Sequence, residues 1–117
     1  MPLPAGKWKM TVNGVEGTID ISQSRPEMFT ATHSEFGRLE GFWDETSQTI
    51  TFHVKEPDGI ALFKGYLMRA AQGQEPGRDV MVTLAGSMQV AGSLVSFFNA
   101  TARRNVFGWF AQITEVV

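Results

Sequence analysis

The sequence predicts an all-β protein, an antiparallel up-and-down meander closed into a barrel of eight strands, or of nine. Three observations indicate this fold. Short runs of alternating apolar and polar residues follow one another over residues 1–117, with no helical pattern long enough to be stable between them. The connections are short, which favours pairing of consecutive strands. Four glycines lie inside strand-like runs, where they allow the coiling of a small barrel: Gly41, Gly65, Gly86 and Gly108. A β-sandwich is the alternative architecture.

Five strands are expected in the first half of the chain, because runs of alternating residues there are separated by turn residues. They are Trp8–Val12, Thr18–Ser22, Met28–His33, Gly37–Trp43 and Gln48–Lys55. The last two form the clearest hairpin. The polar loop 44-DETS-47 joins them, and their apolar residues share one face.

Four further strands are expected in the second half: Ile60–Arg69, Val80–Met88, Leu94–Thr101 and Val106–Val116. The segment 71-AQGQEPGRD-79 has no apolar anchor and is the longest expected loop. The final two strands are expected to pair through 102-ARRN-105. The last strand is apolar on both faces, whereas a half-buried surface strand needs only one apolar face.

Length and composition narrow the possible functions. A chain of 117 residues forms one domain, 1–117. The net charge of −2 argues against nucleic acid or an anionic membrane as a partner, since both attract basic surfaces. The absence of cysteine excludes disulfides and thiolate metal sites. The sequence has neither a signal-peptide pattern nor an apolar run long enough to span a membrane, so the expected location is the cytoplasm.

No catalytic motif is present in the chain. The G-x-S-x-G frame of a nucleophile elbow and the spacing of a phosphate-binding loop are both absent. A metal site built from His33, Glu35 and His53 is not expected, because alternation turns His53 outward. No cofactor is predicted. An enzyme, such as an isomerase or hydrolase using Tyr66 or a carboxylate at the barrel mouth, ranks third among the expected functions.

The aromatic residues suggest what the barrel does. Several of them can face the interior: Trp43, Phe52, Phe63, Phe97 and Trp109. An eight-stranded barrel is either packed solid by such side chains or holds one small ligand. Polar anchors for a ligand are expected among His33, Tyr66 and Asn99, although the alternation leaves open whether Tyr66 points in or out. The leading hypothesis is a non-catalytic barrel that binds a small apolar or aromatic ligand. The alternative is an interaction barrel with a solid core.

Gly6-Lys7-Trp8 opens the first expected strand. It resembles the G-x-W that opens the first strand in the calycin superfamily of lipocalins, fatty-acid-binding proteins and avidins. The resemblance implies that Trp8 closes one barrel end beneath a basic side chain, here Arg103 or Arg104. The phrases 37-GRLEGFWD-44 and 83-TLAGSM-88 resemble the strands of streptavidin, and the helix-free avidin-like branch is the most similar.

The chain departs from the biotin-binding pattern of that branch. Streptavidin-like proteins carry an Asn two residues after the first Trp, where this chain has Met10. Their late W-K strand is here Gly108-Trp109-Phe110. The resemblance therefore does not predict biotin as the ligand.

Large apolar residues are expected on the outside of the barrel. If Trp43, Val82 and Trp109 point inward, then Phe42, Met81, Val106 and Phe110 point outward, and Phe98 joins them if Phe97 points inward. Most of these lie on the last strands, which are neighbours in a meander, and a contiguous exposed apolar patch marks a partner site. The sequence predicts a homodimer or homotetramer built on the outer faces of the C-terminal strands.

Overall fold

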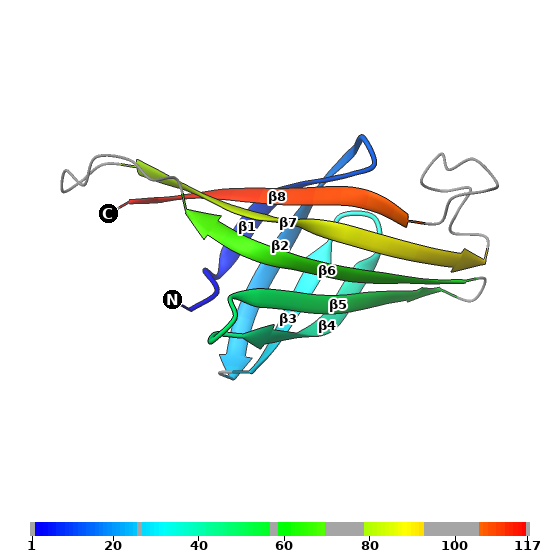
Figure 1. Ribbon diagram of the computed structural model, residues 1–117, viewed down its shortest axis with the longest axis horizontal. Helices are drawn as coiled ribbons and strands as arrows, with labels where there is room; N and C mark the ends of the chain where they lie inside the picture. The colour runs from blue at the N-terminus through cyan, green and yellow to red at the C-terminus, as the bar shows by residue number, and fades with distance from the viewer. Residues whose placement is uncertain (1, 26, 57–58, 70–78, 93–105, 117) are drawn as a thin grey trace.

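A computed structural model describes residues 2–25, 27–56, 59–69, 79–92 and 106–116. It confirms the predicted fold class, since eight antiparallel strands close into a barrel in meander order (Figure 1). The strands are β1 (Gly6–Val12), β2 (Val15–Arg25), β3 (Met28–His33), β4 (Gly37–Asp44), β5 (Thr49–Glu56), β6 (Gly59–Arg69), β7 (Asp79–Gly92) and β8 (Val106–Val116).

The barrel closes where β8 pairs with β1. The register runs from Lys9 opposite Gln112 to Val12 opposite Trp109. On its other side, β8 pairs directly with β7. The expected pairing of Leu94–Thr101 with Val106–Val116 is therefore corrected, because β7 and β1 are the neighbours of β8. The barrel has eight strands, and Leu94–Thr101 lies outside the described residues.

Alternation along each strand separates core from surface as the sequence predicts. In β4 every second residue is buried, so Leu39, Gly41 and Trp43 point inward while Phe42 points outward. The facing residues of β5 continue this layer, with Ile50 opposite Trp43. One hydrophobic core runs through the barrel.

The barrel is elongated, with extents of 48 × 27 × 24 Å. Strands β6, β7 and β8 contain 11, 14 and 11 residues and run along the long axis, while β1 and β2 cross them steeply (Figure 1). The outer surface of these three strands therefore forms a long continuous wall.

Gly65, Gly86 and Trp109 form one row across β6, β7 and β8. The indole N–H of Trp109 donates to the carbonyl oxygens of Ser87 at 3.0 Å and Lys64 at 3.3 Å. A Cβ atom at Gly65 would lie 2.7 Å from the Trp109 ring, and one at Gly86 would collide with the Lys64 carbonyl oxygen. Only glycine allows the indole and the neighbouring backbone this close approach.

Trp8 lies at the end of the barrel where the chain enters β1. It is fully buried, and its indole N–H donates to the Pro4 carbonyl oxygen at 3.1 Å. Leu3 is also part of the core. The predicted burial of Trp8 is confirmed, whereas Arg103 and Arg104, expected to cover it, lie outside the described residues.

Candidate functional site

The middle of the barrel is occupied by a group of aromatic rings. Phe52 and Phe63 stack with centroids 4.6 Å apart, and Trp109 meets both rings edge-on at 5.7 and 5.8 Å. Phe29 packs edge-on against Phe52 at 6.0 Å. Phe63 and Trp109 thus point inward as predicted, but these contacts make them part of a packed layer. A ligand in this layer would have to displace the rings.

His33 is the last residue of β3, next to the β3–β4 turn, and is only 6% exposed. Its Nδ1 accepts the backbone N–H of Glu35 at 3.0 Å and of Phe36 at 3.4 Å, so the proton of the neutral ring is on Nε2. The ring stacks on Phe36 at 4.4 Å. His33 therefore organises the β3–β4 turn, and these contacts account for its position without a ligand.

Burial lowers the pKa of His33 below its usual value of 6.5, while the nearby Glu35 carboxylate acts in the opposite direction. The unfolded chain then binds the proton more readily than the folded one. The stability contributed by the neutral ring is complete above about pH 6.5 and is lost as the pH falls through the lowered folded pKa.

We therefore expect the free energy of unfolding to fall between about pH 7 and pH 5, and to fall less in His33→Asn. The Asn side chain can still accept a turn N–H but does not titrate. Urea unfolding at several pH values measures the difference. The control is His53→Asn on the exposed face of β5. Its free energy of unfolding should still fall as in the wild type, because His33 is unchanged. If the free energy of unfolding falls equally with pH in the wild type and in His33→Asn, the stabilising role of the neutral His33 ring is contradicted.

Tyr66 and Asn99 were the other expected polar anchors. Tyr66 is 55% exposed on the outer surface, since β6 turns Ala61, Phe63 and Leu67 inward. The orientation of Tyr66, which the alternation leaves open, is therefore outward, and Tyr66 is not an anchor inside the barrel. Asn99 lies outside the described residues.

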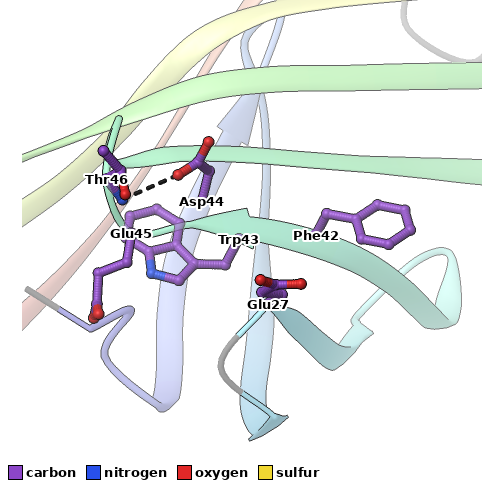
Figure 2. A pocket seen from close by; sticks show the side chains of 6 residues that line it. All are labelled: Glu27, Phe42, Trp43, Asp44, Glu45 and Thr46. Atoms are coloured by element: carbon purple, nitrogen blue, oxygen red, sulfur yellow. Dashed lines mark hydrogen bonds between the residues drawn. The ribbon is translucent and has the colours of Figure 1, made fainter.

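Trp43 borders a pocket at the rim of the barrel, on the same end as Trp8. The rim pocket has a volume of about 450 Å³ and is lined by Glu27, Phe42, Trp43, Asp44, Glu45 and Thr46. Figure 2 shows Phe42 and Trp43 leaving β4 in opposite directions, with Glu27 approaching from the turn between β2 and β3. A backbone hydrogen bond holds β4 and the β2–β3 turn together here, because the main-chain N–H of Trp43 donates to the Glu27 carbonyl oxygen at 3.0 Å.

The β4–β5 turn fixes the other wall of the rim pocket. The Oδ1 atom of Asp44 accepts the N–H of Thr46 at 3.0 Å and of Ser47 at 3.3 Å (Figure 2 marks the first). This Asx-type turn holds Glu45 and Thr46 at the rim. Gln48, with a positive φ of 56°, ends the turn and bonds through its side chain to the Glu45 carbonyl oxygen.

The indole nitrogen of Trp43 distinguishes it from the other two tryptophans. Trp8 and Trp109 donate to backbone carbonyl oxygens. Trp43 is 1% exposed, yet its Nε1 has no hydrogen-bond partner among the described residues. A buried donor without an acceptor destabilises a protein by about 1–3 kcal/mol. In Figure 2 this nitrogen lies on the ring edge that faces away from Phe42, on the side of Glu45.

The outer wall of β6, β7 and β8 carries a second feature, an outer apolar face made of Tyr66, Met68, Met81, Ala85 and Phe110. Tyr66, Ala85 and Phe110 lie in one register row across the three strands. The four large side chains are 41–55% exposed. The outward orientation predicted for Met81 and Phe110 is confirmed, as is that of Phe42 at 63% exposure, while Phe98 lies outside the described residues.

Among the described residues, no three His, Asp or Glu side chains are grouped so that they could hold a metal ion. Nor does this part of the chain contain a helix of the length and apolar character needed to cross a membrane. Comparisons with protein families, with curated proteins and with solved structures find no match for this chain.

Proposed function

We propose that the protein is a non-catalytic small-molecule-binding barrel whose ligand lies in the rim pocket against Trp43. The observation that carries the proposal is the buried indole N–H that lacks an acceptor beside a pocket of ligand size. Small-molecule sites combine apolar walls with a few polar groups that orient the ligand. Here Phe42 and Trp43 supply apolar surface, and the N–H supplies the directed donor.

The rim is favoured over the interior by the packing of the described side chains. The stack of Phe52 and Phe63 with the Trp109 edge fills the middle layer, and Trp109 has already used its N–H on two carbonyl oxygens. Trp43 is the one tryptophan whose donor remains for a ligand among the described residues. The proposed site thus retains Trp43 from the set predicted by sequence and adds the turn residues around it.

Membership of the calycin superfamily belongs to the same proposal. Its support is the Gly6-Lys7-Trp8 opening of β1 together with the buried position of Trp8 at one end of an eight-stranded antiparallel barrel. A cytoplasmic location stays a prediction from the sequence.

The binding proposal is tested by screening a small fragment set against ¹⁵N-labelled protein and following the three indole N–H signals. A fragment bound in the rim pocket should shift the Trp43 signal and leave those of Trp8 and Trp109 in place. Trp43→Phe keeps a buried ring and removes only the donor and part of the ring, so it should weaken binding of the same fragment. If no fragment shifts the Trp43 signal selectively, the rim pocket is not the ligand site.

Self-association is a second proposed function, and the outer apolar face supports it. Its central polar groups are satisfied locally, since the Gln112 amide donates to the Thr83 hydroxyl at 3.4 Å. Such a face can be buried without leaving unpaired groups. A second copy of the chain is the proposed partner, because a twofold axis needs only one self-complementary patch.

Phe110→Glu should convert the wild-type dimer or tetramer into monomers, since it would bury an unpaired charge in the interface. Sedimentation velocity measures the change. Thr32→Glu is the matched control, because it adds the same charge at an exposed position on β3, away from β8. A wild-type chain that sediments as a monomer at micromolar concentration contradicts this second proposal.

A further inference from the structure

We infer that the ligand of the rim pocket is a small organic cation that also carries a hydrogen-bond acceptor, an inference that rests on the proposed function. Two independent features of the pocket lead to this chemistry. Three carboxylates line it, from Glu27, Asp44 and Glu45, and no described cationic side chain lines it with them. The buried indole N–H of Trp43 lacks an acceptor, which a ligand can supply. Because the pocket is rich in carboxylates, it favours a ligand that carries positive charge together with that acceptor.

The three carboxylates differ in the hydrogen bonds that they already accept from the protein. Asp44 accepts two backbone N–H groups of its own turn. Glu27 and Glu45 are exposed, and within the described residues neither side chain forms an ion pair. Both of these carboxylates are therefore open to a positively charged group at the rim.

The aromatic residues fit an organic cation rather than an anion or a neutral polar compound. The Phe42 ring lines the pocket and is 63% exposed, and an exposed aromatic ring attracts an ammonium or guanidinium group. A bare metal ion fits less well, because the described carboxylates do not converge as a ligand group. Metal ions of the carboxylate-binding type also need several oxygen ligands at close range.

The acceptor half of the ligand is set by the Trp43 donor. The Nε1 atom is enclosed by the protein in the free state. A ligand therefore reaches it only as the rim opens slightly, and the group that meets it must be a compact oxygen such as an amide or ester carbonyl. The ligand therefore carries its positive charge toward Glu27 and Glu45 at the rim and its carbonyl toward the indole. An amide-bearing alkylammonium compound of a few carbons has this layout.

Three probes of equal chain length separate the two requirements. The compound ε-aminocaproamide has both the ammonium and the carbonyl, hexylamine has only the ammonium, and hexanamide has only the carbonyl. Each is titrated into the 117-residue protein by calorimetry, and the three indole N–H signals show where it binds. We expect ε-aminocaproamide to bind at least about tenfold more tightly than either partial probe and to shift the Trp43 signal.

The double variant Glu27→Gln/Glu45→Gln supplies the charge test. It should weaken ε-aminocaproamide by about tenfold or more and leave hexanamide unchanged, and added salt should weaken the wild-type complex in the same direction. Glu40→Gln is the matched control, because Glu40 is an exposed acid on β4 that does not line the rim pocket. It should bind all three probes like the wild type.

The outcomes separate the two claims. If hexanamide shifts the Trp43 signal as strongly as ε-aminocaproamide, and the double variant binds both equally, the cation inference is overturned while binding at the rim pocket stands. If no probe shifts the Trp43 signal but a neutral fragment does, the cation inference is also overturned and binding at the rim pocket also stands. If neither the probes nor any fragment moves this signal, the proposed function falls together with the inference.

Discussion

Trp8→Ala should lower the free energy of unfolding by about 3–5 kcal/mol, the usual range for removal of a buried large aromatic side chain. Trp8 has no exposed surface and belongs to the core that Leu3 joins from the N-terminal segment. The substitution leaves a cavity at the barrel end. It also removes the hydrogen bond from the indole N–H to the Pro4 carbonyl oxygen, so this segment loses one of its links to the barrel.

Urea denaturation followed by circular dichroism measures this loss. Lys9→Ala is the neighbouring control, because Lys9 lies on the same strand with its side chain exposed, and surface changes of this kind stay within about 0.5 kcal/mol. A loss below about 1 kcal/mol for Trp8→Ala would contradict the closed barrel end described above.

Gly86→Ala should destabilise the protein by about 3 kcal/mol or more, at the upper end of the cost of overpacking. The added Cβ would meet the Lys64 carbonyl oxygen and approach the Gly65 Cα to 2.5 Å. Both contacts are with backbone, which cannot rotate away like a flexible side chain. The strand pair β6–β7 would have to separate where Trp109 rests on it.

Gly108→Ala tests whether the loss comes from this contact or from the general removal of a strand glycine. Gly108 lies beside Trp109 on β8, and a Cβ atom there meets nothing within 4 Å. We expect Gly108→Ala to be neutral or slightly stabilising, because alanine restricts the unfolded chain. Equal losses for the two variants, measured by thermal unfolding, would rule out the close approach at Gly86.

The inward-facing residues of most strands could be predicted because their alternation is unambiguous. In β1 only one face is apolar, and in β4 Phe42 is the one apolar residue on the outer face. A shift of one residue would expose the whole core side, so the register follows. Strand β6 has apolar residues on both faces, and the sequence alone left the orientation of Tyr66 open. The structure fixes it, because Gly65 is buried with its inward side against the Trp109 ring, so the neighbouring Tyr66 points outward.

The candidate site was accessible to sequence reasoning only in part. Trp43 could be placed inside from the alternation of β4, but its unpaired N–H depends on which carbonyl groups come near it in the fold. Glu27 joins the rim pocket through the turn between β2 and β3, far from Asp44 in sequence. The local signal that could have revealed the turn is Asp44 followed by Thr46 and Ser47, an Asx-turn pattern.

His33 shows the limit of inferring roles from residue type. A histidine near the end of an apolar strand was a reasonable candidate for a ligand anchor. In the fold its Nδ1 accepts hydrogen bonds from two backbone N–H groups three residues or fewer away, so its role is set by the turn that follows it. Spacing to Glu35 and Phe36 was visible in the sequence, but the direction of the ring was not.

The central claim is that Trp43 holds a buried donor without an acceptor until a ligand supplies one, and the indole N–H signals of the free protein test it most directly. A hydrogen bond moves an N–H proton signal downfield. With assignments from Trp8→Phe, Trp43→Phe and Trp109→Phe, we expect the Trp43 indole proton upfield of the other two in the free protein. It should move downfield when ε-aminocaproamide is added. A Trp43 proton already as far downfield as those of Trp8 and Trp109 without ligand would contradict the account.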